Sequence, residues 1–115
     1  MLPLVYPVLI GDAAVSALVA TRIYRHGRAP QEVAVPYITW SISGAPENAF
    51  EGPDHDFCRV QVDCWSDDDA QLEALGKAVR DAMEPHAHMT LFEGTPDDTT
   101  GRFRMMLLFD WIEPR

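Results

Sequence analysis

The amino-acid sequence predicts a single α+β domain in which helices pack on a mainly antiparallel sheet. Residues 37–43 and 57–65 alternate strictly between apolar and polar side chains, which is typical of strands with one buried face. A segment with apolar residues at helical spacing follows them, and a last alternating segment, 102–112, comes after it. The chain has 115 residues, the usual size of one domain. We therefore expect one domain over residues 1–115.

The first helix is predicted after Asp12, which can act as its N-cap. It is followed by AAVSALVAT, whose apolar residues share one helical face. Residues before Gly11 suggest a further helical turn that opens at Pro3, but Pro7 is expected to break or kink it. A short strand is expected at 22–24.

The two alternating segments predict a hairpin. On one side lie Ile38, Trp40 and Ile42, matched in the second segment by Cys58, Val60, Val62 and Cys64. Residues 44–56 (GAPENAFEGPDHD) hold two prolines and two glycines, and they predict a long polar loop between the strands.

The main helix is predicted between Ser66 and Pro85. Ser66 can cap it, and the three aspartates at 67–69 suit its first turn, where the helix dipole favours negative charge. Residues 89–93 and 102–112 then predict a second hairpin around GTPDDTTG. The predicted order is α-β-β-β-α-β-β, with about four to five strands and two helices.

The net charge is −9, from 9 basic and 18 acidic residues. This charge argues against a surface that grips nucleic-acid phosphates and against adhesion to anionic membranes. No apolar stretch is long enough to cross a bilayer, and the start lacks the basic region of a signal peptide, so we expect the chain to be cytoplasmic where it is made. Cys58 and Cys64, six residues apart on one strand, are expected to be reduced core residues.

The sequence offers little sign of catalysis. His86 and His88 are two potential metal ligands, whereas a structural zinc site uses four. Capping accounts for the aspartates at 67–69, and neither a phosphate-binding glycine loop nor a nucleophile elbow occurs. We expect no catalytic residues, no metal and no cofactor. Arg102 and Arg104, interleaved with Phe103, are interpreted as strand residues whose arginines meet carboxylates, of this chain or of a neighbouring subunit.

A set of ordered segments resembles a known family. These segments are ALV at 17–19, RIY at 22–24, APQ at 29–31, PYITWSISG at 36–44 and RVQVDCW at 59–65. Together they resemble the tail-completion (tail-terminator) family of long-tailed bacteriophages, prophages and gene transfer agents, over roughly residues 13–83.

The resemblance implies a helix-backed α+β fold that assembles as a ring, typically a hexamer, on the last ring of the tail tube. Its partners would be other copies of itself, the tail tube protein and the head connector or stopper protein. DNA would pass through the ring without specific binding, and no membrane would take part. The protein would be assembled in the host cytoplasm and reside in the tail or neck of the virion. The family has no catalytic residues to transfer.

Two groups of residues are predicted to serve such a ring. The predicted assembly contacts are Glu47, Asn48, Phe50 and Glu51 in the 44–56 segment, together with Arg22 and Arg59. Phe50 is an apolar ring in a polar segment, which suggests a knob that needs a pocket. The predicted acidic lining of the channel is Asp54, Asp56, Asp97 and Asp98.

Three other interpretations remain open at this point. The closest is a connector or stopper in the same neck. The second is a small α+β module that binds a ligand, which predicts a defined apolar pocket and no ring. The third is a small hydrolase or metal enzyme that uses His86, His88 and nearby carboxylates, which predicts that metal is retained through purification.

Overall fold

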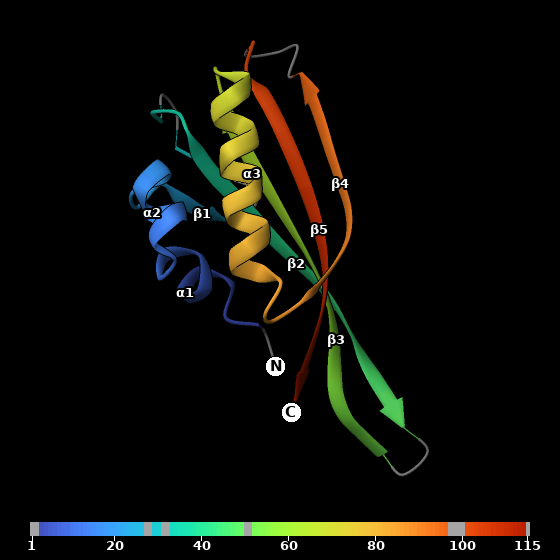
Figure 1. Cartoon of the computed structure of the whole chain (residues 1–115). Coiled ribbons are helices and arrows are strands. Elements are labelled where there is room, and N and C mark those ends of the chain that lie inside the picture. The colour runs from blue at the N-terminus through green and yellow to red at the C-terminus, as the bar shows by residue number, and fades with distance from the viewer. Residues whose placement is uncertain (1–2, 27–28, 31–32, 50–51, 97–100, 115) are drawn as a thin grey trace.

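Three helices cover one face of a five-stranded sheet in the computed structural model of the chain (Figure 1). The structure describes residues 3–26, 29–30, 33–49, 52–96 and 101–114, and their side chains except at 45–49, 52–56 and 113–114. The elements are α1 (Val5–Ile10), α2 (Ala13–Val19), β1 (Ile23–Arg25), β2 (Tyr37–Ala49), β3 (Gly52–Ser66), α3 (Asp69–Met83), β4 (His88–Pro96) and β5 (Phe103–Pro114). The strand order is β1-β2-β3-β5-β4. The predicted α+β class is confirmed, with one helix more than predicted.

The additional helix, α1, contains Pro7. The expectation that Pro7 breaks the helix is wrong, because Pro7 is the third residue of α1. In the first turn an amide has no helical acceptor, so a proline costs no hydrogen bond there. The predicted N-cap of α2 is confirmed, since Asp12 Oδ1 accepts a hydrogen bond from the Val15 amide at 3.0 Å.

The main helix α3 begins two residues later than a Ser66 cap would require. Its N-cap is Asp68, whose Oδ1 accepts a hydrogen bond from the Ala70 amide at 2.9 Å. Ser66 is instead the last residue of β3, where it is buried and donates to Gln71 Oε1 at 2.8 Å. The prediction that Ser66 caps the helix is wrong because serine and aspartate are equally good caps, and this segment offers several in a row.

The β2–β3 hairpin is much longer than predicted. The expected loop at 44–56 is wrong: β2 runs to Ala49 and β3 starts at Gly52, with a register shift between Glu47 and Asn48. Backbone pairing alone extends this segment, because antiparallel hydrogen bonds do not require alternating side chains. These parts of β2 and β3 were not predicted because their sequence lacks alternating apolar residues.

The core lies between the helices and the middle of the sheet. β3 is the central strand, paired antiparallel with β2 on one side and β5 on the other. The predicted buried stripe of β3 is confirmed: Cys58, Val60, Val62 and Cys64 are each at most 1% exposed. Both cysteines are free thiols, as expected, and burial, followed by the charge of neighbouring Asp63, raises the pKa of the Cys64 thiol. β1 adds a short parallel strand at one edge.

The helix-free face of the sheet carries two arginine–aspartate pairs. Arg104 donates from Nε to Asp63 Oδ1 at 3.0 Å, and Gln61 donates to the other carboxylate oxygen at 3.0 Å. Asp63 is 7% exposed, so this pair is largely shielded from water. The second pair, Arg59–Asp110, is longer at 3.4 Å and more exposed.

These two pairs predict different costs of losing an arginine. Arg104→Met keeps the alkyl stem but leaves the buried Asp63 carboxylate without its charged partner, so the free energy of unfolding should fall by about 2 kcal/mol. Arg59→Met should reduce it by less than about 1 kcal/mol, because exposed ion pairs contribute little. Urea denaturation followed by tryptophan fluorescence measures both. Equal losses would contradict this assignment.

Candidate assembly surfaces

The β2–β3 hairpin extends beyond the rest of the molecule as an arm. β1 pairs with β2 only at Ile38–Trp40, so past this point the outer edge of β2 has no partner strand in the described part of the chain. Figure 1 shows the arm projecting away from the helices. The radius of gyration is 14.7 Å, against about 13 Å for a compact domain of this size. The arm, residues 44–58, is therefore a surface available for assembly.

Four of the predicted contacts fall on this arm. Glu47 lies opposite His55 and Asn48 opposite Pro53 in the strand register, and the structure gives only their backbone. Phe50 and Glu51 lie outside the described residues. Of the contacts predicted from the 44–56 segment, the structure thus places the backbone of Glu47 and Asn48 on the arm.

Arg22 and Arg59 lie elsewhere. Arg22 donates from Nε to the Pro36 carbonyl at 2.9 Å and from Nη2 to the Leu18 carbonyl at 3.3 Å, so it joins the end of α2 to the segment before β2. Arg59 pairs with Asp110 on the helix-free face. Both arginines thus have partners within their own chain, and their part in assembly stays a prediction.

The four residues of the predicted acidic lining come from two separate segments of the chain. Asp54 and Asp56 lie on the arm part of β3, next to His55, which pairs with the last residue of β5. Asp97 and Asp98 are outside the described residues; they follow Pro96, which pairs with the first residue of β5. A strand of this length separates its ends by more than about 30 Å. The backbones of His55 and Pro96 therefore lie toward opposite ends of the sheet.

The opposite edge of the sheet is formed by β4. Nearly the whole strand is exposed, including Leu91 (43%) and Phe92 (60%). No further strand pairs with its outer edge among the residues described. Exposed apolar side chains on a free edge strand are typical of a surface that another chain covers. The sequence analysis expected a strand here but assigned it no role.

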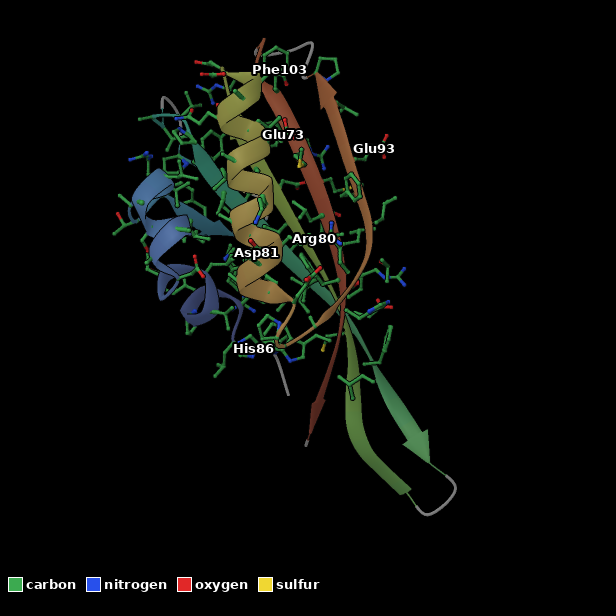
Figure 2. All side chains as sticks on the ribbon, in the orientation of Figure 1. Glu73, Arg80, Asp81, His86, Glu93 and Phe103 are labelled. Atoms are coloured by element: carbon green, nitrogen blue, oxygen red, sulfur yellow. The ribbon has the colours of Figure 1, made fainter. Side chains whose placement is uncertain are left out.

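A groove of about 750 Å³ runs between α3 and the β4–β5 hairpin. Its apolar lining includes Leu72, Met89 and Phe92, and in Figure 2 Phe103 lies at one end of α3 and His86 at the other. Gly76 brings α3 close to β5, since a Cβ at this position would collide with Met105 Sδ. A glycine inside a helical pattern was the available signal for this close approach.

A second pocket of about 450 Å³ lies between α1, β1 and β2, and we call it the N-terminal pocket. Its lining residues are Pro3, Leu4, Val5, Tyr6, Pro7, Ile23, Arg25, Trp40 and Ile42. Leu4 and Tyr6 are exposed, and the Arg25 guanidinium lies 5.3 Å from the centroid of the Trp40 ring. Trp40 itself is buried, and its Nε1 has no acceptor in the described structure. Sequence reasoning missed this pocket because three separate segments form it.

The helix-free face also holds an aromatic cluster at the end of the sheet remote from the arm. Tyr37 and Trp65 stack with centroids 5.9 Å apart, and Trp65 Nε1 donates to Thr39 Oγ1 at 3.1 Å. Arg104 lies over Trp65, and Arg102 lies over Tyr37 and donates to its hydroxyl. Of the two interpretations of these arginines, the structure supports the internal one for Arg104, since it pairs with Asp63 of the same chain.

The two histidines considered as metal ligands lie beside different residues. His86 stacks on Trp111 at 5.5 Å, and His88 lies opposite Asp110 in the sheet. Within the described ranges no group of three or more histidine, cysteine or acidic side chains could hold a metal ion. Nor is any helix of those ranges long and apolar enough to span a membrane.

Comparisons with known proteins agree with the resemblance seen in the sequence. A search of curated proteins found no match. Among solved structures, a chain from "Virion of native gene transfer agent (GTA) particle" is similar, with a TM-score of 0.80 and 19% identity. The alignment covers 96% of this chain and 92% of that one, which establishes a shared fold. The family profile "Tail completion protein gp17" matches residues 3–112. The chain therefore belongs to the tail completion protein gp17 family.

Proposed function

We propose that this protein forms a ring, typically a hexamer, at the head-proximal end of a tail tube. There it ends tube polymerisation and joins the tail to the head around a channel for DNA, as a component of a phage or phage-like virion. The observation that carries the proposal is membership in the tail completion family over nearly the whole chain. The likeness to a chain of a gene transfer agent virion supports it at the level of the fold.

Ring formation requires a head-to-tail interface, in which two different surfaces of each subunit meet. The sheet offers two different edges, β1–β2 on one side and β4 on the other. The β4 edge presents Leu91 and Phe92 to solvent, and the β2 edge continues into the arm. A two-fold dimer joins the same surface of both subunits, whereas a ring joins two different surfaces. The two unlike edges at opposite sides of this sheet therefore suit a ring better.

The two ends of the long axis suit the two axial partners. The molecule measures 50 × 29 × 23 Å, with the arm at one end and the last residues of β4, paired with the first of β5, at the other. We propose that one end contacts the tail tube protein and the other contacts the connector or stopper protein. This role is mechanical and needs no catalytic group.

The charge of −9 suits a channel through which DNA slides. Carboxylates along a channel repel phosphates and so prevent the genome from adhering to the wall. Because Asp54 and Asp56 lie at the arm end and Asp97 and Asp98 follow the last residue of β4 at the other, we propose two acidic levels along the channel rather than one.

Tube termination predicts a direct effect on tube length. Purified protein added to polymerising tail tube protein should cap the growing end, shorten the mean tube length at least twofold and add a ring of density at one end. Electron microscopy measures both quantities. Bovine serum albumin at equal concentration controls for crowding. Tubes of unchanged length without an end ring would contradict the proposal.

Neutralising the aspartates proposed to line the channel should slow DNA release and leave particle assembly unchanged. Particles that carry Asp54→Asn and Asp56→Asn should form normally and eject DNA several-fold more slowly, because phosphates are repelled less strongly. Fluorescence of a DNA-binding dye measures ejection. The matched control is Glu73→Gln with Asp81→Asn, the same charge change on exposed positions of α3. Unchanged ejection in the arm variant, or equal slowing in the control, would remove these aspartates from the lining.

A further inference from the structure

We propose that the N-terminal pocket of one subunit receives the acidic arm tip, residues 47–51, of a neighbouring copy of this chain. The inference rests on the proposed ring and names the contact that holds it together. It follows from the chemistry of the pocket, the composition of the arm tip and the positions of both in one subunit.

Arg25 gives the pocket a positive charge that no carboxylate of the described residues neutralises. Four other basic side chains form ion pairs within the chain: Arg59 with Asp110, Lys77 with Asp81, Arg80 with Glu84, and Arg104 with Asp63. Arg22 is bound to two carbonyl oxygens. Arg25 is exposed, and the described residues provide it with the Trp40 ring but no carboxylate. In a protein with a net charge of −9, an arginine without an acidic partner is unexpected.

Trp40 places a hydrogen-bond donor in the same pocket that no described residue accepts from. Its ring is 7% exposed, and its Nε1 has no hydrogen-bond acceptor in the described part of the chain. A buried donor without an acceptor costs about 1–3 kcal/mol. A neighbouring chain that lies beside Arg25 can supply this acceptor through a carboxylate or a backbone carbonyl. The exposed Arg25 side chain would rotate toward that chain to allow the contact.

The walls of the pocket also expose large apolar side chains. Leu4 is 64% exposed and Tyr6 42%, next to the buried Val5. Tyr6 lies in α1 and Leu4 just before it. Two exposed large apolar side chains so close together are typical of a surface that is covered on assembly. The pocket therefore suits a segment that combines acidic groups with an aromatic ring.

The arm tip has this composition. Residues 47–51 (ENAFE) contain Glu47, Glu51 and the aromatic Phe50, and no lysine or arginine. Asp54 and Asp56 lie outside this contact and stay in the proposed channel lining. The carboxylates of the arm tip complement Arg25, and Phe50 can fill the apolar pocket. The arm also provides the reach, since it extends beyond the domain as a pair of strands.

A subunit does not fill its own pocket. Figure 1 shows the arm leaving the domain on the side away from α1 and β1. The contact is therefore between copies, and it joins two different surfaces, which generates a ring when the rotation closes.

A charge-reversal series tests the contact. Arg25→Glu should weaken self-association at least tenfold, because it places a carboxylate against an acidic arm. Glu47→Lys with Glu51→Lys should weaken it similarly, and the combination with Arg25→Glu should restore at least part of the loss. Lys77→Glu makes the same charge change on α3 and should stay within twofold of the wild type. Light scattering with tail tube protein present measures association, and circular dichroism checks folding.

A cross-linking experiment separates this contact from the ring itself. Arg25→Cys and Phe50→Cys chains are mixed and treated with a short bismaleimide. Cys58 and Cys64 are buried, and the raised pKa of the Cys64 thiol keeps it protonated, so the introduced cysteines react selectively. A cross-linked heterodimer is expected, and denatured chains at equal concentration give the background.

The outcomes are distinct. A ring without the cross-link above background, or without a response to Arg25→Glu, overturns the pocket contact and leaves the proposed function standing. A cross-link between chains that never form a ring supports the contact and overturns the ring. Equal weakening by Lys77→Glu would show a general charge effect and would also overturn the contact.

Discussion

Burial of one face of β3 is the constraint that determines the rest of this structure. Val60 and Val62 are fully buried beneath the helices, while Gln61 and Asp63 on the same strand face the other way. A shift of one residue in pairing would exchange these faces and place charged groups in the core. The register of β3 with β2 and with β5 is therefore fixed, and the register in turn determines how far the hairpin extends past the domain. The arm is a consequence of the same pairing that forms the core.

The sequence predicted the elements whose side chains carry a period. β3 and α3 were predicted because alternation and helical spacing report burial directly. The arm was missed because residues 44–56 do not alternate between apolar and polar side chains, so the sequence shows no strand pattern there. Ser66 and Asp68 show a finer limit: both can cap a helix, and only the end of β3 decides between them. Pro7 similarly reads as a breaker until the start of α1 is known.

The surfaces for assembly could be predicted only in part. Glu47 and Phe50 were singled out because they share one polar segment, and that segment is the arm. The N-terminal pocket could not be found in this way, since Leu4, Arg25 and Trp40 come from three segments that only the fold brings together. The separation of the backbone at 54–56 from the end of β4 likewise depends on strand register, which composition does not report. The features proposed for assembly lie at the edges and ends of the sheet, and its buried centre holds them in place.

The central claim is that copies of this chain close into a ring on the tail tube. The measurement that tests it most directly is the mass of the assembled species, by light scattering or native mass spectrometry, of the protein alone and with tail tube protein. The account predicts a closed ring, typically of six chains, at least when tube protein is present. A chain that stays monomeric and ignores the tube protein in both conditions would contradict it.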